Sequence, residues 1–158
     1  MGIFSRLFAR APRYHVSAYA PIYSAIVARL TRTGVTVGGT AALPRIEVHT
    51  ITEGERQDKD GALRQLSLTV ECMSNKSMND AVAMNDTNLR LLTEQDLTVT
   101  GWTVLGIVPT LLQDLTEVSD TQKVVYRLIQ QFNIFVDQVK ATPTPTPTTT
   151  PSTENTNS

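Results

Sequence analysis

The chain has 158 residues, of which 41% are hydrophobic and 18% are charged, and its formal net charge is −1. A chain of this length can bury one apolar core without disulfides or metals, and its single cysteine, Cys72, excludes an internal disulfide. No apolar run reaches the roughly 20 residues of a membrane-spanning helix, so we expect no membrane association.

Charge is distributed unevenly along the chain. No acidic residue precedes Glu47, and six arginines give that first segment a charge of +6. The remainder holds 8 basic and 15 acidic residues, hence −7. Sectors of opposite charge favour head-to-tail association of copies, whereas charges that intermingle in space would not.

The first 16 residues form a basic segment that precedes the predicted domain. It contains Arg6, Arg10 and Arg13 and no acidic residue. Its composition resembles that of a mitochondrial targeting peptide, but it is short and poor in serine. We therefore interpret residues 1–16 as an arm that docks onto a partner, with these three arginines as candidate contacts.

Two helices are predicted. The first spans Ala20–Thr33, because Pro21 suits a first helical turn and Gly34 suits a stop. The second begins after Ser77, which is a favourable N-cap, and ends near residues 93–95. Its expected buried stripe consists of Met78, Ala81, Val82, Leu89 and Leu92.

A strand over residues 45–52 and a strictly alternating strand over residues 65–72 flank a charged loop, Glu53–Gly61. Alternation places Leu66, Leu68, Val70 and Cys72 on one buried face. The loop exceeds the usual length of about 2–5 residues in a hairpin, which favours a binding element over a merely solvated tip. Its candidate partner contacts are Glu53, Glu55, Arg56, Asp58, Lys59 and Asp60.

Three further strands complete the predicted sheet. Trp102–Val108 is expected to end at Pro109, and residues 115–118 form a short strand. The last strand, Val124–Val136, is long and apolar on both faces, so we expect it to bend, to carry a bulge or to be covered by another subunit. Arg127 and Phe135 lie on its second face and are candidate subunit contacts.

These elements predict an α+β fold with a small, mostly antiparallel sheet of about 4–5 strands and two helices packed on it. Residues 17–140 form the single domain, with a long hairpin loop. Residues 141–158 are almost entirely Thr, Pro, Ser and Asn. Such a composition cannot bury enough apolar surface to fold, so we predict a disordered tail.

Reaction chemistry is not evident in the sequence. His15 and His49 lie far apart without a second ligand at metal spacing, and one cysteine cannot build a zinc site. Phosphate-binding, hydrolase and metalloprotease motifs are missing. Aromatic residues do not alternate with basic clusters as in nucleic-acid-binding domains. We therefore expect no enzyme activity, no cofactor and no metal.

The order of elements resembles that of the tail terminator, or tail completion, proteins of long-tailed bacteriophages. The segments that carry the resemblance, within residues 20–139, are Ile22–Ile26, Leu43–Val48, Thr52–Glu55, Arg64–Ser74, Ser77–Leu92 and Val125–Phe132. Arg45 and Glu47 depart from it, since the first strand of these relatives is more apolar.

The resemblance implies a structural virion protein. Members of this family form a hexameric ring that caps the tail tube and offers a face to the head. The implied partners are further copies of the chain, the tail tube protein and a head completion or neck protein, with DNA only passing through a lumen. The implied location is the virion, after assembly in the host cytoplasm. Another head–tail connector or neck protein, or a small cytosolic binding or enzymatic domain, are the alternatives.

Overall fold

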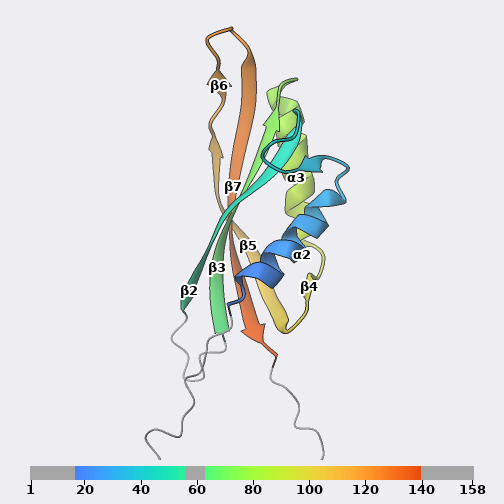
Figure 1. Ribbon diagram of the computed structural model, residues 1–158, viewed down its shortest axis with the longest axis vertical. Helices are drawn as coiled ribbons and strands as arrows, with labels where there is room; N and C mark the ends of the chain where they lie inside the picture. The colour runs from blue at the N-terminus through green and yellow to red at the C-terminus, as the bar shows by residue number, and fades with distance from the viewer. Residues whose placement is uncertain (1–16, 56–62, 140–158) are drawn as a thin grey trace, which may run out of the picture.

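A computed structural model describes residues 17–55 and 63–139. Two helices cover one face of a twisted sheet, and the β6–β7 hairpin extends beyond them (Figure 1). The elements are α2 (Tyr19–Thr31), β1 (Thr36–Val37), β2 (Arg45–Glu55), β3 (Leu63–Ser74), α3 (Met78–Thr93), β4 (Thr98–Val99), β5 (Trp102–Asp114), β6 (Glu117–Val118) and β7 (Val124–Gln138).

The sheet has seven strands in the described part of the chain. Its order is β1-β2-β3-β7-β5-β4, and β6 pairs with β7. All pairs are antiparallel except β1–β2, which is parallel. The α+β class is therefore confirmed, but the predicted sheet of about 4–5 antiparallel strands is too small. β6 lies within the predicted short strand 115–118, whereas β1 and β4 have two residues each, which is too short to produce a periodic signal in the sequence.

Alternation along β3 produces the core, as predicted. Leu66, Leu68, Val70 and Cys72 are fully buried beneath the helices. Phe132, Ile134 and Val136 of the neighbouring β7 are fully buried in the same layer. This face is shielded from solvent because α2 and α3 pack across it, with Ile22, Ile26 and Leu30 as the buried apolar side chains of α2.

The second helix begins where the sequence indicates, but its buried stripe differs. Ser77 accepts a hydrogen bond from the backbone N–H of Asp80, which confirms the predicted N-cap. Val82 is 40% exposed, so its predicted burial is wrong. Asn85 and Asn88 are buried instead, because the helix turns this side toward the sheet. The Asn88 amide donates to the Cys72 sulfur over 3.1 Å.

The four long strands, β2, β3, β5 and β7, all extend past their predicted ends, and two of these extensions change what was expected of a segment. β2 continues through Glu55, so residues 53–55 belong to the strand and not to the predicted loop, whose remainder lies outside the described residues. β5 passes through Pro109 to Asp114 instead of stopping there. Proline is tolerated in an edge strand, where its missing N–H removes no bond from the interior of a sheet.

The predicted division into an arm, a domain and a tail stays a prediction. The structure describes most of the domain, whereas the arm (1–16) and the tail (141–158) lie outside the described ranges.

Replacing Leu68 by Asp should unfold the domain. The change places an unpaired carboxylate in the apolar core, at a cost above about 4 kcal/mol. Ser67→Asp is the matched control, since Ser67 is exposed on the opposite face of the same strand. Chemical denaturation should show a large loss of stability for the first variant alone, and comparable losses for both would contradict the assignment of the faces.

Candidate interaction surface

The predicted interface residues do not form one cluster in the described part of the chain. Glu53, Arg127 and Phe135 are described, on β2 and β7. Glu55 belongs to β2, but its side chain is not described. The remaining predicted contacts lie outside the described residues: Arg6, Arg10, Arg13, Arg56, Asp58, Lys59 and Asp60.

Glu53 is engaged within the chain and is not a free loop carboxylate. Its carboxylate accepts hydrogen bonds from the Ser17 hydroxyl at 2.6 Å and from the Ala18 backbone N–H at 3.2 Å. The first turn of α2 has neither an acidic residue nor a side-chain cap of its own. Glu53 therefore supplies, from a distant strand, the negative charge and the acceptor that a helix N-terminus needs.

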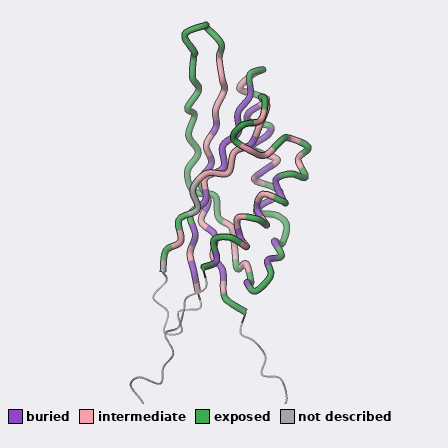
Figure 2. Tube along the Cα trace, viewed as in Figure 1, coloured by how far each residue is buried: buried purple, intermediate pink, exposed green. Residues whose placement is uncertain are grey.

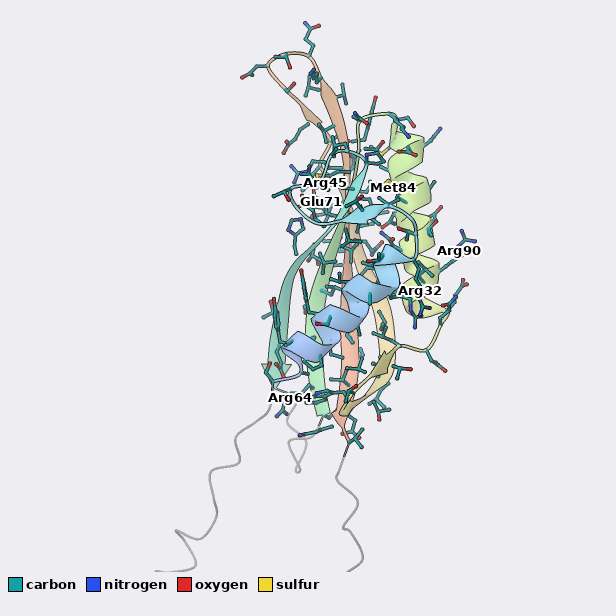
Figure 3. The ribbon with its side chains drawn as sticks, turned by 45° about the vertical axis from the view of Figure 1, so that its right-hand side comes forward. Arg32, Arg45, Arg64, Glu71, Met84 and Arg90 are labelled. Atoms are coloured by element: carbon teal, nitrogen blue, oxygen red, sulfur yellow. The ribbon has the colours of Figure 1, made fainter. Side chains whose placement is uncertain are left out.

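Arg127 belongs to a network of charged side chains on the helix-free face of the sheet. Its guanidinium donates hydrogen bonds to Glu71 and to Glu117, and so joins β3 and β6 through β7. The other Glu71 oxygen lies 2.5 Å from His49 Nε2, and Glu47 lies 3.3 Å from the same nitrogen. Arg45 donates to Glu47 over 2.7 Å, and Arg45 and Glu71 lie close together in Figure 3.

Glu71 is the buried centre of this network, with 1% of its surface exposed. Burial by itself raises the pKa of the Glu71 carboxyl, but the hydrogen bonds from Arg127 and His49 and their positive charges outweigh this effect. The pKa of Glu71 therefore lies below its ordinary value of 4.5. The alternation that buries Val70 and Cys72 on one face puts Glu71 on the other face, but it does not predict that Glu71 is buried there.

Glu47, His49 and Glu71 also have the spacing of a metal site, since one ligand atom from each lies within 4.8 Å of the others. Two guanidinium groups contact the same carboxylates, Arg45 on Glu47 and Arg127 on Glu71. Their positive charges oppose a second cation at this point. The arrangement therefore fits an ion-pair network better than a metal centre.

Exposed apolar side chains gather along β5 and the start of the hairpin. The exposed fraction is 57% for Leu105, 52% for Leu112 and 67% for Val118. Leu111, Val108 and Leu115 between them are also exposed. Figure 2 shows this run in green from β5 through β6. A strand that ends at Pro109, as the sequence predicts, would not contain most of this surface.

The backbone edge of β5 is open over most of its length. β4 pairs only with Trp102 and Thr103 of β5. From Val104 to Asp114 the strand pairs with β7 on one side, and no strand of the described residues pairs on the other. A long, apolar open edge is a template for another strand.

Two shallow depressions lie on the helix-free face. One, of about 210 Å³, is lined by Thr52, Ser67, Leu68, Thr69, Thr110, Gln131, Phe132 and Asn133. None of these side chains is an acid, a base or a nucleophilic thiol. The other, of about 310 Å³, lies beside the charged network and is lined by Leu43, Arg45, Glu47, Met73, Glu117, Val125 and Arg127.

No protein-family model matches the chain, and no curated protein sequence matches it. Among solved structures, the chain is similar to a protein chain of the "Virion of native gene transfer agent (GTA) particle". The TM-score is 0.55 and the identity 16%, over 75% of this chain and 92% of that chain. At this identity, the likeness shows a shared fold.

Neither described helix combines the length and the apolar character that crossing a membrane requires.

Replacing Glu71 by Gln should destabilise the fold by about 2 kcal/mol at pH 7, because it removes charge-assisted hydrogen bonds from a buried site. Because the pKa of Glu71 is lowered in the folded state, the ionised carboxylate contributes its full stabilisation above about pH 4.5, and this stabilisation is lost as the pH falls further. The difference in unfolding free energy between the wild type and the variant should therefore shrink in acid. A difference that is independent of pH down to the acid transition would contradict the network.

Proposed function

We propose that the chain is a structural virion protein that forms a ring of identical subunits at the end of a tail tube and joins the tube to the head or neck. The observation that carries the proposal is the fold shared with a chain of a gene transfer agent virion, which spans nearly all of that chain. Because the sequence also resembles tail terminators, the proposed position of the ring within the virion is the end of the tail. The proposal assigns no catalytic role to the chain.

Two features of the structure support a role in assembly. The first is the open apolar edge of β5, which exposes Leu105 and Leu112 to water by more than half. Exposed apolar surface of this kind marks a place where a partner binds. The second is the projecting β6–β7 hairpin, whose tip lies beyond the rest of the sheet (Figure 1). A projecting hairpin suits contact with the next ring along a tail axis.

Light scattering and tail assembly test the proposal together. We expect the purified chain to form oligomers with masses that are multiples of 17.4 kDa, either alone or on addition of tails that lack it. We expect it to bind at one end of these tails and to make them competent to join heads. Binding to heads but not to tails would favour another connector or neck protein, and a monomer that binds neither would contradict the proposal.

A matched pair of variants separates assembly from folding. The double substitution Leu105→Lys and Leu112→Lys should reduce self-association at least tenfold, because lysines on an edge strand oppose pairing with another strand. Both positions are exposed, so the melting temperature of the monomer should change little. Val82→Lys on α3 replaces an exposed apolar residue away from the edge and should leave assembly unchanged.

A further inference from the structure

We propose that copies of the chain associate by pairing the open edge of β5 with the open edge of β2 in a second copy, so that one sheet continues from copy to copy. The inference rests on the proposed ring and names the surfaces that close it. The contact would be made by the backbone, because an open strand edge offers unpaired N–H and C=O groups that another strand can bind.

The chain has two open edges on opposite sides of the same sheet. β1 pairs only with Arg45 and Ile46 of β2, and no described strand covers the rest of β2 on that side. β4 covers only the first two residues of β5. Two unlike edges on one subunit give a head-to-tail contact, which forms a ring when the rotation closes.

The two open stretches lie at the same level of the sheet. Following the paired residues across β3 and β7 shows that Gly54 of β2 and Gly106 of β5 lie at the same height along the strands, and that Glu47 and Gln113 do as well. The intermediate partners are Gln65 and Phe135 at one end, and Glu71 and Ile129 at the other. β1 lies beyond one end of this span and β4 beyond the other, so a neighbour at the same height meets neither.

The direction of the strands also suits the contact. Three antiparallel steps separate β2 from β5, through β3 and β7, so the two edge strands run in opposite directions. A neighbour in the same orientation therefore presents its β2 antiparallel to β5. Antiparallel pairing is the slightly more stable arrangement per residue.

Each open stretch contains one bulge, and the two bulges lie at overlapping heights, while a second bulge of β5, between Val104 and Gly106, lies where its stretch begins. β2 has one extra residue relative to β3 between His49 and Thr52. β5 has one extra residue relative to β7 between Pro109 and Leu112, and the two irregular stretches overlap in height. A regular strand would lose register against either bulge. Residues 47–54 and 106–113 have equal lengths and one bulge each, so they can stay in step on both sides of it.

The side chains of the two stretches are compatible. Val108, Leu111 and Leu112 on β5 are exposed and apolar, so pairing would remove them from water. On β2, Glu47 is paired with Arg45, and Glu53 is engaged at the start of α2. The contact therefore brings no unpaired carboxylate onto the apolar edge.

Cysteine cross-linking tests the pairing directly. Thr52 and Val108 are exposed and share one level of the sheet, through Ser67 and Asn133. Within one copy, three strand spacings of about 4.8 Å separate them, which exceeds the reach of a disulfide. Cys72 adds no background, because burial raises the pKa of its thiol to about 12.

On mild oxidation, the double variant Thr52→Cys/Val108→Cys should form a ladder of covalent oligomers that ends at the ring size. A mixture of the two single variants should stop at dimers. The control Thr52→Cys/Val82→Cys, whose second thiol lies on α3, should give no ladder.

Each other outcome overturns a different statement. Oligomers by light scattering without a ladder would overturn the edge pairing and leave the proposed ring intact. Covalent dimers from Val108→Cys alone would mean that β5 pairs with itself, which also overturns the head-to-tail contact. A chain that stays monomeric with and without tails would overturn both the pairing and the proposed function.

Discussion

The antiparallel pairing of β3 with β7 is the interaction on which the rest of the structure depends. It runs without a register shift from Leu63 opposite Asp137 to Ser74 opposite Tyr126. Because side chains alternate along both strands, this single register places the apolar core under the helices and the charged network on the opposite face. A slip of β3 by one residue would turn Leu68 out of the core and Glu71 into it. Both the apolar core and the charged network would be lost.

The same central pair determines where the open edges lie. β2 and β5 each pair with one central strand and leave their outer edges largely uncovered by the described residues. Since the central pair has no irregularity, the pairing across β3 and β7 determines which residue of β5 lies at the same height as each residue of β2. The proposed assembly uses this property, because a neighbour can dock only if its bulge and its open stretch meet their counterparts at the same height.

The features that sequence reasoning found and those that it missed differ in their physical origin. Leu66, Leu68, Val70 and Cys72 reveal their strand because period-two alternation is a local pattern, and Ser77 reveals the helix start for a similar reason. The short strands β1 and β4 depend on pairing partners and leave no local pattern. Pro109 predicts a strand end unless the strand is known to lie at an edge. Glu53 and Glu71 acquire their roles from residues distant in sequence, Ala18 and Arg127, so their contacts could not be derived from the residues around them.

Hydrogen exchange of the backbone amides bears most directly on assembly through the sheet edges. It should be compared between the assembled wild type and the monomeric Leu105→Lys/Leu112→Lys variant. Pairing between copies predicts that the amides of residues 106–113 and 47–54 that point to the open edges exchange slowly only in the assembled form, while the central amides of β3 and β7 stay slow in both. Outward amides that exchange equally fast in the assembled and the monomeric form would contradict edge pairing.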